Sequence, residues 1–290
     1  MTSAPEVFHW HNDGIRLTGE RWRGHPGEDI VVLLHGGGQT RHSWKSTALR
    51  LARDGRTALV LDARGHGDSD WDPGKDYTLD AFVSDLVALV DMLDGPPVLV
   101  GASLGGITSL VAAGEYPGLA RGLVLVDIVV RPEAAGVARI ASFMHAHHDG
   151  FASLEDVAEA IAAYNPARKR PSNLDGLRKN VRLHDDGRWY CHWHWDPAFM
   201  RIDKEPVRDA DPDRRAKAAA RIDVPTLIVR GRRSDVVSDA GVDEMKRLIP
   251  HAATVEVGAA SHKVAGDDND AFTASLEQFL ASVDRRPAAM

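Results

Sequence analysis

Short apolar runs alternate with helical stripes along most of the chain. The runs are rich in valine, isoleucine and leucine: residues 30–34, 57–61, 98–100, 123–126, 226–229 and 254–257. Between them, apolar residues recur at the spacing of one helix face: residues 43–54, 78–93, 104–115, 239–248 and 270–283. Continuous apolar runs are typical of strands that are buried on both faces. The alternation therefore predicts an α/β protein with a mostly parallel central sheet and helices on both faces.

The alternation stops between residues 131 and 221. This stretch is helical and polar, and it carries a cluster of tryptophans and histidines. Closely spaced tryptophans need burial, so we expect an inserted helical lid packed over one end of the sheet rather than a mobile linker. The expected organisation is a core of residues 1–130 and 222–290 with a lid of residues 131–221. Four lid side chains are expected to line a substrate pocket, the alternative being that they only form the lid's own core: Trp189, His192, Trp193 and Trp195.

A G-x-S-x-G sequence, Gly101-Ala102-Ser103-Leu104-Gly105, lies between a predicted strand and a predicted helix. Its glycines permit a strained turn in which the flanking chains pass too closely for a Cβ atom. The turn would lift the Ser103 hydroxyl above the sheet and place it at a helix N-terminus, which favours developing negative charge. We expect Ser103 to be a nucleophile, and a purely structural turn is the alternative.

A nucleophilic serine needs a base, and the base needs a carboxylate that fixes its tautomer. Of the 14 histidines, only His262 follows the last predicted strand at the carboxyl edge of the sheet, where Ser103 must also emerge. Asp235 follows the next-to-last predicted strand and gives the order serine, acid, histidine that is expected with this turn. Asp127, at the end of the strand after the G-x-S-x-G helix, is the rival. The sequence favours Asp235 as the acid and keeps Asp127 as the alternative.

The intermediate of such a reaction carries an oxyanion, which needs two backbone N–H donors. Leu104, directly after the nucleophile, is expected to supply one of them, and Gly37 in the glycine-rich segment of residues 35–38 the other. A glycine-rich loop could also bind phosphate. However, the sequence has neither the lysine and serine of a P-loop nor the G-x-G-x-x-G spacing of a dinucleotide site here.

Charge and composition exclude several classes of protein. The net charge of -7 and the lack of a basic stripe argue against nucleic-acid or anionic-membrane partners. The sequence shows no signal-peptide pattern and no apolar run near the roughly 18 residues of a membrane span. Its single cysteine, Cys191, excludes an internal disulfide, so we expect a cytoplasmic protein. Cys191 itself is expected to pack as a small hydrophobe.

Histidines and aspartates gather in two groups that suggest metal ligands: His145, His147 and His148, and His184, His192 and His194 with Asp185, Asp186 and Asp196. On a helix, however, the first two of these histidines would diverge by about 200°. Hydrolysis by a serine nucleophile also requires no metal. We therefore expect no metal and no cofactor, and we interpret most of these side chains as packing residues.

The order of these motifs resembles that of the α/β-hydrolase superfamily over roughly residues 15–130 and 222–283. The motifs are the glycine-rich segment, Asp62-Ala63-Arg64-Gly65-His66-Gly67-Asp68-Ser69, the G-x-S-x-G turn, Asp235 and His262. In the family, the segment of residues 62–69 is a structural turn. The chain also resembles haloalkane dehalogenases and epoxide hydrolases, but these use an aspartate where it has Ser103. The resemblance implies acyl chemistry, by an esterase, a lactonase, a C–C bond hydrolase or a cofactor-free perhydrolase.

We therefore expect a serine hydrolase that cleaves a small, largely apolar carboxylic ester or lactone through an acyl-enzyme. C–C bond hydrolysis and cofactor-free perhydrolysis on the same triad are the alternatives. A non-catalytic ligand receptor on the same scaffold is the alternative from another class, although a receptor needs no nucleophile. The expected partner is a small-molecule substrate, and we expect the lid to determine which substrate binds. The sequence leaves open whether the protein forms a homo-oligomer.

Overall fold

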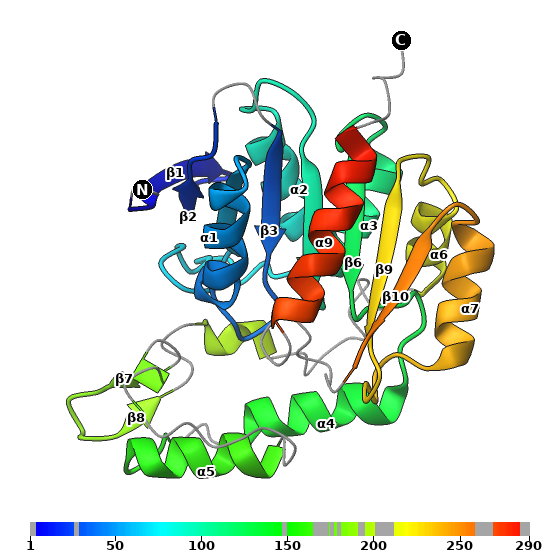
Figure 1. Ribbon diagram of the computed structural model, residues 1–290. Helices are drawn as coiled ribbons and strands as arrows, with labels where there is room; N and C mark the ends of the chain where they lie inside the picture. Colours follow the sequence, from blue (N-terminus) through cyan, green and yellow to red (C-terminus); the bar gives the residue numbers. More distant parts are fainter. Residues whose placement is uncertain are drawn as a thin grey trace.

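The computed structural model describes residues 4–25, 29–146, 150–164, 174, 177–178, 181–190, 195–200, 212–258 and 269–284. Eight strands form one sheet in the order β1-β2-β4-β3-β5-β6-β9-β10 (Figure 1). They are β1 (Glu6–Asn12), β2 (Ile15–Trp22), β3 (Ile30–Leu34), β4 (Thr57–Asp62), β5 (Val98–Ala102), β6 (Gly122–Val126), β9 (Thr226–Gly231) and β10 (Ala253–Val257). The strands from β4 to β10 pair in parallel, whereas the hairpin β1–β2 adds to β4 antiparallel. The predicted α/β architecture with a mostly parallel sheet is confirmed.

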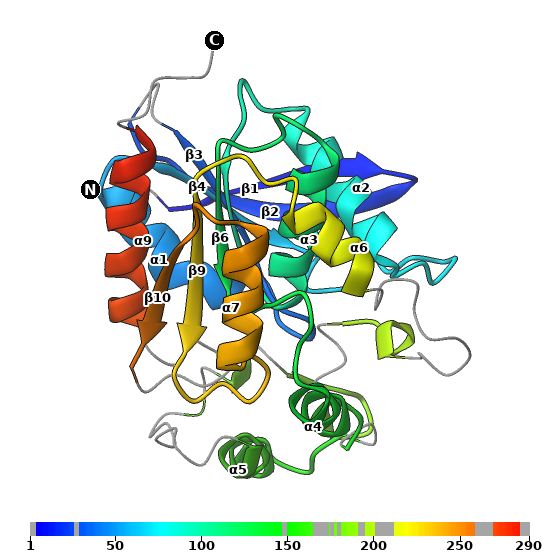
Figure 2. The same cartoon turned by 90° about the vertical axis from the view of Figure 1, so that its right-hand side faces the viewer.

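Helices cover both faces of the sheet, and each face has its own hydrophobic core (Figure 2). One face is covered by α1 (Lys45–Arg53) and α9 (Asn269–Asp284), and the other by α2 (Leu79–Val90), α3 (Leu104–Glu115), α6 (Pro212–Ala219) and α7 (Asp239–Leu248). Successive strand residues enter opposite cores: in β3, Val31 and Leu33 face α1 and α9, and Val32 faces α2 and α3. This explains why the central strands are apolar throughout. None of the described helices is long and apolar enough to cross a membrane.

Between β6 and α6 the chain crosses the carboxyl edge of the sheet, below the strand ends in Figure 1. Its described elements are α4 (Ala134–His145), α5 (Leu154–Tyr164), the hairpin β7 (Arg182–Leu183) and β8 (Trp189–Tyr190), and the 3₁₀ turn η4 (Pro197–Met200). This is the segment that the sequence suggests as a lid, and we refer to these elements as the lid. It has a small core of its own, which includes Phe151, Val157, Leu177 and Val181.

Helix α6 packs on the main core rather than with the lid. A Cβ atom on Gly114 of α3 would lie 2.3 Å from the carbonyl oxygen of Ala218, so the two helices are in close backbone contact. The guanidinium of Arg214 also pairs with Glu115 of α3 at 2.8 Å. Within the expected lid of residues 131–221, α6 is therefore the part that packs on the core. The charged residues of this helix suggest a lid surface, but its alanines form the face that packs.

Candidate active site

Ser103 lies on a tight turn between β5 and α3, as the G-x-S-x-G sequence predicts. Its φ of 49° and ψ of -117° are unusual for a residue with a side chain. The flanking glycines permit the turn, because a Cβ atom on Gly101 would lie 2.3 Å from the Gly105 carbonyl oxygen, and one on Gly105 2.6 Å from Leu34 Cβ. The Ser103 N–H donates to the carbonyl of Val126 on the neighbouring strand. The turn is thus held between α3, β3 and β6.

The glycine-rich segment of residues 35–38 lies directly beside this turn. A Cβ atom on Gly36 would lie 3.2 Å from Ser103 Cβ, and the Gly105 N–H donates to the carbonyl of His35 at 3.1 Å. Leu104 is the first residue of α3, where backbone N–H groups have no acceptor within the helix. The structure therefore brings together the two segments from which the oxyanion donors Gly37 and Leu104 are expected.

Two buried histidines fix the glycine-rich segment against the turn that follows β4. His66 Nε2 accepts from the Gly38 N–H at 3.0 Å, while its Nδ1 donates to the Arg64 carbonyl. His35 Nε2 accepts from the Ala63 N–H, and its Nδ1 donates to the Gly36 carbonyl. Because a backbone N–H can only donate, both rings are neutral. Burial lowers the pKa of His35 to about 4 and that of His66 to about 3, and the neighbouring His35 lowers the latter further.

These lowered pKa values predict that acid destabilises the fold. Below the unfolded pKa of 6.5 the unfolded chain takes up protons that the two buried histidines refuse, so the free energy of unfolding falls as the pH drops toward 4. The slope is about 1.4 kcal/mol per pH unit for each histidine. Urea unfolding between pH 7 and 4.5 should show a smaller slope in His66→Gln, whose amide oxygen can still accept from Gly38. Ser275→Ala on α9, which changes no titratable group, should keep the wild-type slope. An unchanged slope in His66→Gln would contradict the prediction.

Asp127 follows β6, next to the turn that carries Ser103. It is 1% exposed, and its φ of 52° places it, like Ser103, in a conformation that side chains rarely adopt. Its carboxylate accepts from the Gly231 N–H at 3.0 Å and from the Ser234 hydroxyl at 2.6 Å. Strained residues with side chains cluster at functional sites. Ser103 and Asp127 are two such residues, and they lie side by side at the carboxyl ends of β5 and β6. Their strain indicates a functional site at this edge of the sheet.

Asp235 faces the lid. Its Oδ2 forms an ion pair with Arg139 of α4 at 2.7 Å, and both side chains are partly exposed. A Cβ atom on Gly136 would lie 2.2 Å from the Asp235 carbonyl oxygen, so the first turn of α4 presses on this loop. The other carboxylate oxygen, Oδ1, is buried and has no hydrogen-bond partner among the described residues. Asp235 is therefore attached to the lid by one oxygen, and the second is left to accept a further donor.

Several expected site residues lie outside the described residues: His262, His192, Trp193 and also Cys191. The structure separates the two tryptophans that it does describe. Trp189 packs against the lid's own core and beneath the guanidinium of Arg178, at 4.8 Å from the ring centre. Trp195 lies at the glycine-rich segment, with its Nε1 3.8 Å from where a Cβ of Gly38 would be. In the described part of the chain no three side chains are grouped to hold a metal ion.

Phe199 of η4 is a site residue that the sequence analysis missed. A Cβ atom on Gly37 would lie 3.2 Å from Phe199 Cζ, so the ring touches the segment expected to bind the oxyanion. The ring also packs edge-on against His66, with 4.8 Å between the ring centres. Residues 195–200 show no helix or strand periodicity, so the sequence gives no signal for the position of this ring, which depends on the path of the lid.

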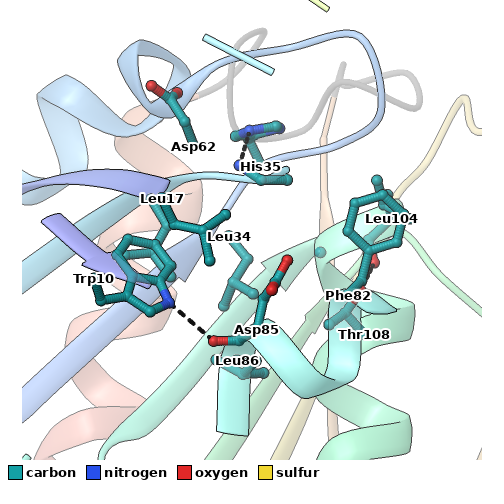
Figure 3. A pocket seen from close by; sticks show the side chains of 13 residues that line it. Trp10, Leu17, Leu34, His35, Asp62, Phe82, Asp85, Leu86, Leu104 and Thr108 are labelled. Carbon is teal, nitrogen blue, oxygen red and sulfur yellow. Dashed lines mark hydrogen bonds between the residues drawn. The ribbon is translucent and has the colours of Figure 1, made fainter. Parts of the chain in front are cut away.

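A cavity of about 40 Å³ lies beneath the glycine-rich segment, between the sheet and α2 (Figure 3). Its lining is mostly apolar, with Leu34, Phe82 and Leu86 around it and His35 and Leu104 at the end nearest the turn. Ordinary ligand pockets enclose roughly 300 Å³ or more. This cavity is too small for a substrate.

Comparison with known proteins agrees with this geometry. The sequence matches the α/β-hydrolase-fold family over residues 29–268. It is 30% identical to esterase Rv0045c of Mycobacterium tuberculosis, over 85% of this chain and 80% of that protein. It is 27% identical to the 3-hydroxybutyrate-oligomer hydrolase of Cupriavidus necator, over 85% and 87% of the two chains. The crystal structure of an E-2-(acetamidomethylene)succinate hydrolase superposes with a TM-score of 0.81 at 25% identity, covering 96% of this chain and all of that one (100%).

Proposed function

This chain belongs to the α/β-hydrolase family, and on that premise we propose that it is a serine hydrolase that cleaves a small, largely apolar carboxylic ester or lactone. The observation that carries the proposal is the strained turn at Ser103, which lies against a glycine-rich segment and at the first turn of α3. Strain of this kind places a hydroxyl where a carbonyl carbon and two N–H donors can meet it. The names of the relatives, an esterase and an oligomer hydrolase, support ester chemistry.

The proposed reaction has two halves, both carried out by a catalytic triad. His262 takes the proton of the Ser103 hydroxyl as its oxygen attacks the acyl carbon, and the N–H groups of Gly37 and Leu104 bind the oxyanion. His262 then gives that proton to the departing alcohol, which leaves an acyl-serine. In the second half His262 takes a proton from a water as the water oxygen attacks the acyl carbon, and the same two N–H groups bind the new oxyanion. The bond between the acyl carbon and the Ser103 oxygen then breaks, the acid departs, and His262 returns the proton to Ser103.

For the acid of the triad we propose Asp235, the residue that the sequence favours. It follows β9 and gives the order serine, acid, histidine. Its Oδ1 is buried and has no hydrogen-bond partner among the described residues, so this oxygen can accept from the N–H of a histidine. Asp127 is the alternative. It is buried, and its two oxygens accept from the Gly231 N–H and the Ser234 hydroxyl, which is the pattern of a residue that braces the end of β9.

Turnover of simple esters tests the proposal. We expect the purified protein to hydrolyse p-nitrophenyl acetate and butyrate with saturation kinetics and with a burst of p-nitrophenol, because an acyl-enzyme accumulates when the second half is slow. The measurement is stopped-flow absorbance. A protein that binds such esters but never releases p-nitrophenol is a ligand receptor, and that result would overturn the proposal.

We also infer a cytoplasmic location, because a protein with one cysteine gains nothing from an oxidising compartment.

A further inference from the structure

The last described part of the lid, residues 195–200, is bonded to the core. The Asp196 N–H donates to the carbonyl of Gly65 at 2.7 Å, and the Tyr77 hydroxyl donates to Asp196 Oδ2 at 2.5 Å. Trp195 forms an isolated antiparallel bridge with His66. Asp196 also closes the turn that follows, since its Oδ1 accepts from the Ala198 N–H at 2.8 Å. These bonds hold η4 in place from the side of the core.

Phe199 is the side chain that this turn presents to the site. Its ring packs edge-on against His66, Tyr77 and Phe82, three side chains of the core. Although held in this way, the residue is only half-buried, so part of it is available for contact. The ring edge touches Gly37. A rigid aromatic surface thus stands directly beside an expected oxyanion donor.

Two further lid side chains close the same side of the site. A Cβ atom on Gly38 would lie 2.7 Å from Met144 Cε of α4 and 3.8 Å from Trp195 Nε1. Together with Phe199, these side chains cover both central glycines of the segment. Little space is therefore left for a substrate between these two glycines and the lid side chains.

The proposed reaction indicates which half of a substrate stays beside these side chains. Ser103 follows β5 and the glycine-rich segment follows β3, the neighbouring strand, so an acyl carbon bonded to the Ser103 oxygen lies close to this segment. The alcohol departs in the first half of the reaction. The acyl group stays bonded to Ser103 through both halves, next to Gly37 and Phe199.

Resting on the proposed function, we propose that Phe199 is a specificity-determining residue that limits the length of the acyl group. Short acyl groups fit between Ser103 and the ring, whereas longer ones collide with it. Because the ring packs against His66, Tyr77 and Phe82, moving it away from a longer acyl group would break these contacts. The enzyme accordingly prefers esters of short-chain acids, largely independent of the size of the alcohol.

The test is kcat/KM for p-nitrophenyl acetate, butyrate and octanoate in Phe199→Ala, Phe199→Leu and Phe199→Trp. In the alanine variant we expect the octanoate-to-acetate ratio of kcat/KM to rise about 10-fold or more, since small changes in an apolar pocket have effects of this size. The leucine variant should change the ratio in the same direction and by less. The tryptophan variant should lower the butyrate-to-acetate ratio of kcat/KM. Because it leaves no cavity, this variant still tests the inference if the alanine and leucine variants do not fold.

Phe151 provides the matched control, because it is a buried phenylalanine of the same lid that packs in the lid's own core. Phe151→Leu should lower the unfolding temperature and leave the acyl ranking unchanged. An unchanged ranking in folded Phe199 variants, or an equal shift in Phe151→Leu, would overturn the inference while ester hydrolysis still stands. A wild-type protein that hydrolyses none of the three esters would overturn the proposed function, and this inference with it.

Discussion

Replacing Ser103 by alanine is expected to abolish ester hydrolysis, with a loss in kcat on the order of 10⁶, as in serine proteases that lose their nucleophile. The hydroxyl is the atom that forms the acyl bond, so no neighbouring group can replace it. The fold should survive, because alanine adds no atom to the turn and the turn is held by backbone bonds. Stopped-flow kinetics measure the loss of activity, and thermal unfolding tests whether the fold survives. Mass spectrometry after treatment with a fluorophosphonate, which labels a nucleophilic serine, tests whether the nucleophile is gone.

Ser275→Ala is the matched control for this variant. Ser275 is a half-buried serine of α9 whose hydroxyl donates to the carbonyl of Ala271 on the same helix. This variant should keep its activity and should gain the mass of one label. Near wild-type turnover in Ser103→Ala, or labelling of that variant, would end the assignment of the nucleophile.

Asp235→Asn is expected to lower kcat by about 10⁴, the loss seen when a triad aspartate becomes an amide and the histidine takes the wrong tautomer. Asp127→Asn should lose much less activity, since its carboxylate braces the end of β9. In that variant the new amide must face the Gly231 N–H and the Ser234 hydroxyl, so the main effect is a loss of stability. Kinetics must therefore be measured at a temperature where urea unfolding shows each variant to be folded.

The pH profile separates a catalytic role of Asp235 from a structural one. Loss of the acid should change the apparent pKa of the base in kcat/KM, whereas a merely loosened loop should scale the whole profile without moving it. The opposite pattern of rates, with Asp127→Asn crippled and Asp235→Asn nearly normal, would assign the acid to Asp127 instead.

The features predicted correctly from sequence are those that depend on neighbouring residues. Continuous apolar strands follow from burial on both faces, which β3 shows by sending Val31 and Val32 into different cores. The turn at Ser103 follows from two glycines that have no room for a Cβ. In both cases the physical requirement is met within a few residues, so the pattern of the chain is enough.

The choice between Asp127 and Asp235 depends on three-dimensional detail that no local pattern contains. Both aspartates follow a strand that ends at the same edge, and both precede His262 in the chain. Only the structure shows that one is buried against Ser234 and that the other reaches a lid arginine. The same limit applies to Phe199, whose neighbours lie more than a hundred residues away in the sequence.

The bonds that hold Asp196 to Tyr77 and Gly65 also define which part of the lid is an exchangeable module. A chimera that took its whole insertion from a relative would remove these bonds and the helix pair of α6 and α3. A junction placed before Trp195 would keep these bonds and the helix pair, and also the Phe199 ring beside Gly37. In evolutionary terms, α5 and the small hairpin can diversify with little effect on the core, whereas α4 and the return path of the chain have to change together with the core residues that they touch.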